Sequence, residues 1–271
     1  MSWWEAALLG LIQGLTEFLP VSSSGHLVLG RHVLGVGADA ESGILFEALV
    51  HLGTVFSILV VYRREILALV QEFGRGIIRP SGYRSMWTEN ESFRLSILIL
   101  ITMIPTGITY LVFKDSIEAA FTDPRFTAAM LLVTGLMLVL TRLRKSPGGH
   151  VTSLKAIGIG IAQSAAMFPG ISRSGATICA GIYQNVDPER ATNFSFLMVL
   201  PVVLIGTGVE VSEAIATGVQ VVWTPMLIGL VVAFLSGILA IKLVLDVIRR
   251  GRLEYFAVYC FIVGGIGLIL L

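Results

Sequence analysis

Charged residues are scarce in this chain: Asp, Glu, Lys and Arg make up 14% of its 271 residues, against 55% hydrophobic residues. Soluble domains carry about 25% charged residues. Together with a mean hydropathy of +0.86, this excludes an ordinary soluble domain and predicts a membrane protein. The formal net charge is only +1, so bulk charge predicts no nucleic-acid partner.

Cysteine is also rare, with only Cys179 and Cys260, both in apolar stretches. Buried, inert thiols are therefore favoured over a disulfide or a metal pair. The first ten residues lack the basic segment of a secretory signal peptide, so we expect no cleavable leader. Strand-like alternation is missing from the apolar stretches, which argues against a β-barrel.

Long apolar segments dominate what is present. Crossing a bilayer takes about 20 apolar residues in a helix. Six stretches qualify: 44–62, 93–113, 126–143, 190–210, 222–247 and 253–271. We predict an all-α polytopic protein that forms a single integral membrane domain over residues 1–271. The hydrophilic stretch 65–92 is predicted to be a loop connection lying on anionic lipid headgroups.

A short motif occurs twice at a constant offset of 150 residues. It reads QGLTEFLPVSSSG at 13–25 and QSAAMFPGISRSG at 163–175. Identical residues occupy five positions: Gln13/Gln163, Phe18/Phe168, Ser22/Ser172, Ser24/Ser174 and Gly25/Gly175. Upstream of the motif, Gly10 and Gly160 keep the same offset. This agreement indicates an internal duplication. The copies differ in charge, because Glu17 and His26 belong to the first and Arg173 to the second.

Each copy joins two short apolar halves through a polar break with proline or glycine. Irregular backbone at membrane depth is tolerated only where protein or a water-filled cavity surrounds it. We therefore expect two re-entrant helix-turn-helix units, at 3–36 and 153–185. Three predicted spans separate them, so the halves, about 1–145 and 146–271, form an inverted-topology repeat. Interrupted segments at matching places in two halves point to a binding site where the repeats meet.

Lysines and arginines predict the orientation in the membrane. They gather at 63–94, on both sides of 153–185, and at 242–252, whereas the other side keeps only Arg31, Lys114 and Arg125. The first group should face the cytoplasm, which places both termini outside. The tips of the two re-entrant units would then meet near the midplane.

Ionisable residues at membrane depth are costly and are functional candidates. They are Glu17, His26, Glu47, His51 and Arg173. Gln13 and Glu17 are four residues apart and share a helix face. The turns Ser22-Ser23-Ser24-Gly25 and Ser172-Arg173-Ser174-Gly175 open helices, and backbone N–H groups at a helix start form an anion cradle. Arg173 adds a planar fork of donors that suits phosphate, and Thr177 follows one turn later.

Each candidate also has a structural explanation. Serines before a helix are often only N-caps, and a membrane histidine such as His51 is often a packing residue. Glu47 could neutralise a neighbouring cation, and Glu17 could be the counter-ion of Arg173. One ion pair would not need two serine-rich cradles, however, so the set favours a phosphate site. The alternative function is a lipid-phosphate or anion transporter or flippase on the same inverted repeat.

The stretches GLIQGLTEFLPVSSSGH and FPGISRSGAT resemble the undecaprenyl-pyrophosphate phosphatases of the bacitracin-resistance family. The resemblance extends through LFEALVHLGT and NFSFLMVLP over essentially the full length. It implies an inverted repeat with two re-entrant units and six spans. It also implies a plasma-membrane phosphatase that acts on a polyprenyl pyrophosphate lipid and recycles the carrier of cell-wall synthesis. Many members have glutamate where this chain has Gln13, so one carboxylate is lost.

The expected roles follow from these residues. Arg173 and the backbone N–H groups of both turns hold the transferring phosphoryl, on a site facing outside. Glu17 acts with Gln13 as a base, or as ligand to a divalent cation, Mg²⁺ or Ca²⁺, with Glu47 as a further ligand. The nucleophile is Ser23, His26 or a water molecule, and the family resemblance favours a covalent route. Binding residues expected around the phosphates are Gln13, Ser22, Ser24, Gly25, Ser172, Ser174, Thr177 and Glu47.

Overall fold

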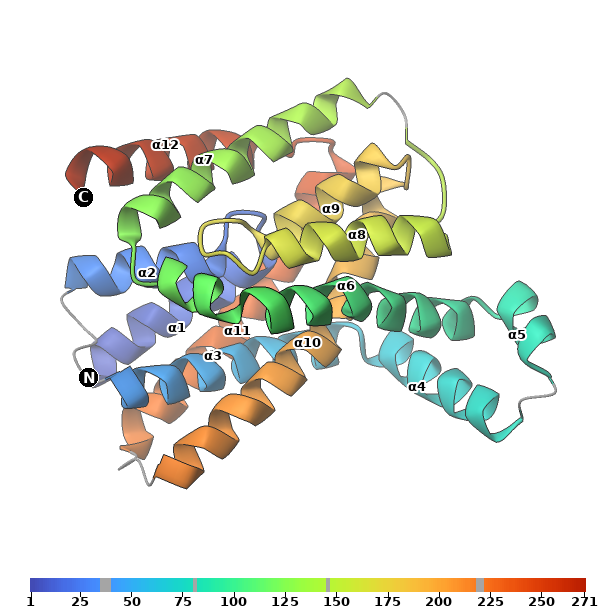
Figure 1. The fold of residues 1–271 in the computed structure, drawn as a ribbon, viewed down its shortest axis with the longest axis horizontal. Helices are drawn as coiled ribbons and strands as arrows, with labels where there is room; N and C mark the ends of the chain where they lie inside the picture. The colour runs from blue at the N-terminus through green and yellow to red at the C-terminus, as the bar shows by residue number, and fades with distance from the viewer. Residues whose placement is uncertain (35–39, 80–81, 145–146, 218–221) are drawn as a thin grey trace.

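The computed structural model describes residues 1–34, 40–79, 82–144, 147–217 and 222–271 (Figure 1). Within these ranges the chain is helical, and it contains no β-strand beyond an isolated bridge between Gly149 and Val186. The helices are α1 (Trp3–Phe18), α2 (Ser23–Leu34), α3 (Ala40–Val61), α4 (Arg63–Ile78), α5 (Tyr83–Glu89), α6 (Glu91–Ala120), α7 (Pro124–Leu140), the 3₁₀ turn η2 (Thr141–Leu143), α8 (Ser153–Ala165), α9 (Arg173–Tyr183), α10 (Pro188–Thr217), α11 (Trp223–Arg249) and α12 (Glu254–Leu270).

Four of the described helices are long and apolar enough to cross a membrane: Glu91–Ala120, Pro124–Leu143, Pro188–Val209 and Trp223–Arg249. A fifth span results if the bent pair Leu45–Val61 and Arg63–Ile78 is counted as one, and the apolar helix α12 is shorter. Large apolar side chains such as Leu111 and Leu235 are exposed on these helices. Such surfaces are typical of contact with lipid, which agrees with the predicted polytopic membrane protein.

The stretch 65–92, predicted to be a loop, is instead mostly helical. Helix α4 leaves α3 at an angle of 87° and packs on α6. A Cβ on Gly76 would lie only 2.1 Å from the Phe93 ring, so the missing side chain lets α4 approach α6. Helix α4 buries Leu69 while Leu67 and Val70 are exposed. The prediction was wrong because the arginines of this segment hide an amphipathic pattern.

The duplicated segments fold into two helix pairs that begin 150 residues apart. Helix α1 starts at Trp3 and α8 at Ser153, and α2 starts at Ser23 and α9 at Arg173. In Figure 1 the α1–α2 pair opens toward the end of the bundle that carries both termini, and the α8–α9 pair opens toward the other end. The connecting turns meet in the middle, where Ser174 Oγ donates to the carbonyl of Leu19 at 3.1 Å.

The first helix of each pair packs on a long helix from the other half of the chain. Helix α1 lies against α11, and α8 lies against α6. The matched glycines permit both contacts: a Cβ would lie 2.5 Å from the Gly229 carbonyl oxygen at Gly10, and 2.7 Å from the Thr102 carbonyl oxygen at Gly160. The equal register of Gly10 and Gly160 is therefore explained by close backbone approach.

Candidate active site

Two serines set the backbone of the meeting turns. Ser22 has a positive φ of 70°, and its Oγ accepts a hydrogen bond from the Gly25 amide at 3.2 Å. Ser172 accepts from the Gly175 amide at 3.0 Å in the same way. Both serines are helix caps, as their structural explanation required. The amides of the first residues of α2 and α9 have no intrahelical partner and remain suited to an anion.

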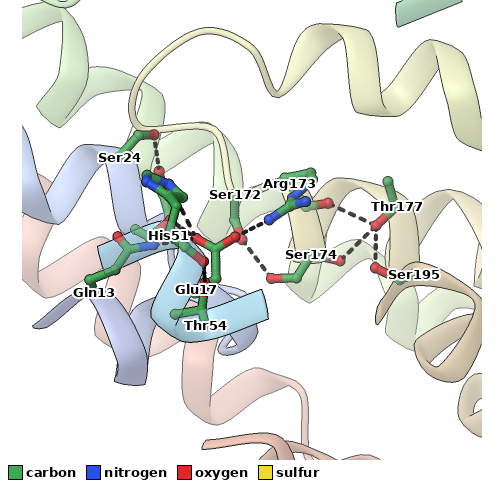
Figure 2. Close-up of polar contacts among 12 residues, drawn as sticks. Gln13, Glu17, Ser24, His51, Thr54, Ser172, Arg173, Ser174, Thr177 and Ser195 are labelled. Atoms are coloured by element: carbon green, nitrogen blue, oxygen red, sulfur yellow. Dashed lines mark hydrogen bonds and ion pairs between the residues drawn. The ribbon is translucent and has the colours of Figure 1, made fainter. Parts of the chain in front are cut away.

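Glu17 is the centre of the polar network at these turns (Figure 2). Its side chain is only 1% exposed. The Oε1 atom accepts from Arg173 Nη2, while Oε2 accepts from Gln13 Nε2 at 2.9 Å and from Ser23 Oγ at 2.6 Å. The network thus joins the acidic motif of the first copy to the arginine of the second. It also places a carboxylate oxygen in hydrogen-bond contact with the Ser23 hydroxyl, a position from which a carboxylate can accept a proton.

Three buried side-chain atoms in the described residues have no hydrogen-bond partner: Gln13 Oε1, Gln163 Oε1 and Arg173 Nη1. All three belong to the duplicated motif. Buried polar groups are nearly always paired, so each exception requires an explanation. A guanidinium N–H without a partner, beside two helix N-termini, is suited to bind an anionic ligand.

His26 follows Ser23 by three residues in the sequence, but its imidazole forms hydrogen bonds with other residues. Its Nδ1 is 2.7 Å from the Ser22 carbonyl oxygen and its Nε2 is 2.8 Å from the Tyr259 hydroxyl. None of the hydrogen bonds found in the described residues joins His26 to Ser23. The contact with Ser23 that the sequence allowed for the imidazole is made by Glu17 instead.

His51, which the sequence leaves as a packing candidate, faces the network. Its Nε2 lies 3.8 Å from Glu17 Oε2, and its Nδ1 bonds to the Glu47 carbonyl at 2.8 Å. The Glu47 carboxylate pairs with Arg31 at 2.6 Å, as expected if it neutralises a nearby cation. His51 was named from the sequence as an ionisable residue at membrane depth, and its contact with Glu17 favours the functional interpretation over packing alone.

The other predicted ligands hold the turns together. Ser24 Oγ is 3.4 Å from Ser22 Oγ, and Ser174 Oγ is 3.2 Å from Ser172 Oγ. Thr177 Oγ1 lies 2.6 Å from Ser195 Oγ on α10. These hydroxyls surround the site and restrain its backbone.

Comparisons with known proteins identify the family of this chain. Residues 6–266 match the family described as bacitracin resistance protein BacA. The chain belongs to this family. A relative from Salinibacter ruber is 55% identical over 100% of both chains, and its name is undecaprenyl-diphosphatase. Relatives with the same name occur in Syntrophotalea carbinolica, 43% identical over 98% of this chain and 97% of the relative, and in Desulforapulum autotrophicum, 39% identical over 99% and 98%.

For this family member, the residues around Glu17 can be tested for a divalent cation. In the described residues no group of three or more His, Cys, Asp or Glu side chains could hold a metal ion. Mg²⁺, however, is often bound by one or two carboxylates together with substrate phosphates. The unpartnered Gln13 Oε1 next to Glu17 fits a cation of that kind, which takes most of its ligands from the substrate.

A separate cavity of about 310 Å³ lies away from this network. It is lined by Tyr62, Arg94, His150, Arg190 and Phe194, among others. None of the residues bonded to Glu17 lines this cavity. The candidate site is therefore assigned to the two turns around Glu17 and not to the cavity.

Proposed function

We propose that this chain hydrolyses undecaprenyl pyrophosphate to undecaprenyl phosphate and inorganic phosphate, and so recycles the lipid carrier of cell-wall synthesis in the plasma membrane. The observation that carries the proposal is Arg173, which bonds to Glu17 through Nη2 while its buried Nη1 atom has no partner among the described residues. The family and the names of the relatives supply the substrate.

The contacts favour Ser23 as the nucleophile. As Oγ forms a bond to the terminal phosphorus, Glu17 Oε2, 2.6 Å away, takes the hydroxyl proton. The bond from that phosphorus to the bridging oxygen breaks, and undecaprenyl phosphate leaves. Glu17 passes its proton to the departing undecaprenyl phosphate and is ionised again. It then takes a proton from the water that attacks the phosphoserine, the bond from phosphorus to Ser23 Oγ breaks, and that proton returns to Oγ as inorganic phosphate leaves. Arg173 and the amides of both turns stabilise charge on the phosphoryl oxygens, as phosphoryl transfer requires.

A divalent cation, Mg²⁺ or Ca²⁺, is part of this proposal. When bound, it would neutralise charge on the pyrophosphate oxygens. Gln13 Oε1 and the Glu17 carboxylate are the atoms of this chain that would hold it. The Glu47 carboxylate is paired with Arg31 and is not assigned to it.

The proposed topology has six crossing helices and two re-entrant pairs, α1–α2 and α8–α9, in an inverted repeat of about 1–145 and 146–271. The equal offset of the helix starts and the opposite openings of the two pairs in Figure 1 support it. The arginine-rich α4–α5 arm lies away from the end with the termini, which supports termini and site on the outside. The orientation is tested with a reporter that is active only in the cytoplasm, fused after Leu271. Activity of this reporter would refute the orientation.

The function is tested with purified protein and undecaprenyl pyrophosphate. We expect stoichiometric phosphate release that stops in a chelator and returns when Mg²⁺ or Ca²⁺ is added. Release that is unaffected by the chelator would remove the cation from the proposal. Uptake of a lipid phosphate or anion by reconstituted vesicles without phosphate release would identify a transporter instead.

Ser23→Ala should block any phosphoenzyme and lower single-turnover phosphate release by at least about 10³-fold, since the attacking oxygen is lost. Ser96→Ala is the matched control, because the Ser96 hydroxyl donates to the Phe93 carbonyl within α6 and belongs neither to the two turns nor to the Glu17 network. Rapid-quench assays measure both variants. Release at the wild-type rate by Ser23→Ala would exclude Ser23 as the nucleophile.

A further inference from the structure

The imidazole of His26 is held at both nitrogens. A carbonyl oxygen can only accept, so the 2.7 Å contact with Ser22 places a proton on Nδ1. In the neutral ring, Nε2 then carries a lone pair. The Tyr259 hydroxyl, 2.8 Å from Nε2, donates to that lone pair.

Tyr259 reaches this position from the last helix, far from His26 in sequence. Its ring stacks on the imidazole with a centroid distance of 5.5 Å and an interplanar angle of 11°. The next residue, Cys260, places its buried thiol 3.9 Å from the Pro20 carbonyl oxygen. Helix α12 is thus packed against the first turn. This contact fixes the backbone of Tyr259 relative to the site.

We propose that Tyr259 is a positioning residue of the phosphatase, which orients His26 and keeps Nε2 as the lone-pair nitrogen. The inference rests on the proposed function. His26 donates from Nδ1 to the Ser22 carbonyl, and Ser22 directly precedes Ser23, the proposed nucleophile. Tyr259 is the side chain bonded to the other ring nitrogen, so it fixes the ring that holds the turn on which Ser23 lies.

The test compares Tyr259→Phe with Tyr255→Phe. The first substitution keeps the stacked ring and removes only the hydroxyl. Tyr255 lies one turn earlier on α12 and bonds to Arg252, which makes it a matched control. We expect kcat to fall roughly tenfold in Tyr259→Phe with KM unchanged, because a small displacement of the Ser23 turn from Glu17 slows the reaction without removing a substrate contact. Tyr255→Phe should keep wild-type values.

A second readout does not depend on activity. Diethyl pyrocarbonate modifies the imidazole lone pair, and mass spectrometry reports each histidine separately. Labelling of His26 should rise several-fold in Tyr259→Phe, while labelling of His32, which is exposed, stays constant. Unchanged labelling of His26, or increased labelling with wild-type kcat, would overturn the proposal. Failure of the proposed function is distinct, because the wild-type protein would then release no phosphate.

Discussion

Arg173→Ala is expected to abolish turnover, with kcat/KM lowered by about 10³-fold or more, the range known for arginines that stabilise phosphoryl transfer. The guanidinium does two things here. Its Nη2 bonds to Glu17, and its buried Nη1 is open to a substrate oxygen. Within the described residues no other Lys or Arg side chain pairs with Glu17, and His51 lies farther from it than Arg173 does. No neighbour therefore replaces the lost charge.

Arg173→Ala also leaves the Glu17 carboxylate buried without its main counter-ion, which is destabilising by about 3–5 kcal/mol for a buried pair. The double variant Arg173→Ala/Glu17→Gln removes both charges and should recover most of that stability. Phosphate release and thermal unfolding are measured on both. Recovered stability in the double variant would identify the unpaired carboxylate as the cause of the destabilisation. Arg173→Ala protein that is folded at the assay temperature but inactive assigns the loss of activity to the phosphate contact. Near-wild-type activity of Arg173→Ala would contradict the phosphate clamp.

Arg173→Lys separates charge from geometry. Lysine keeps the positive charge but lacks the planar fork that can serve Glu17 and a phosphate oxygen together. We expect it to remain well below wild type, by about 10²-fold in kcat/KM. Wild-type activity with lysine would show that charge alone suffices at this position.

The meeting of Glu17 and Arg173 was within reach of the sequence. The 150-residue offset predicts equivalent turns, and the arrangement of three spans between them predicts opposite entry. The identical residues, Ser22 and Ser172, turn out to have the same backbone task as helix caps. The residues that differ, Glu17 and Arg173, bring the charge. For the capping serines, identity within the repeat therefore reflects a shared structural role, whereas the divergent charged residues form the ion pair of the site.

Contacts that involve elements outside the duplicated motif could not be predicted from the sequence. The position of Tyr259 on His26 depends on how α12 packs, and one apolar helix carries no signal of which neighbour it meets. The approach of His51 to Glu17 depends likewise on the rotation of α3 about its axis. The helical fold of α4 was missed for another reason, because an arginine-rich stretch is also typical of a solvent-exposed loop, and its helical periodicity is the weaker signal.

The last prediction concerns Glu17. Glu17→Gln is isosteric and can keep a hydrogen bond to Ser23, yet its amide cannot take a proton. We expect kcat to fall by about 10²–10⁴-fold, the contribution of a general base. Gln13→Glu, by contrast, should leave or raise activity, because it adds a second carboxylate beside Glu17, as the family resemblance implies for this position. Single-turnover phosphate release measures both, and a dead Gln13→Glu enzyme would contradict a shared acidic role.

Exchanging the two side chains decides whether position or charge matters. Gln13→Glu/Glu17→Gln keeps one carboxylate but moves it one helical turn away. Glu17 Oε2 is 2.6 Å from Ser23 Oγ, and none of the described hydrogen bonds joins Gln13 to Ser23. If Glu17 acts as the base for Ser23, the exchanged protein should be as inactive as Glu17→Gln. If it recovers turnover, a carboxylate at either place is sufficient, and Glu17 serves through the cation rather than through the serine.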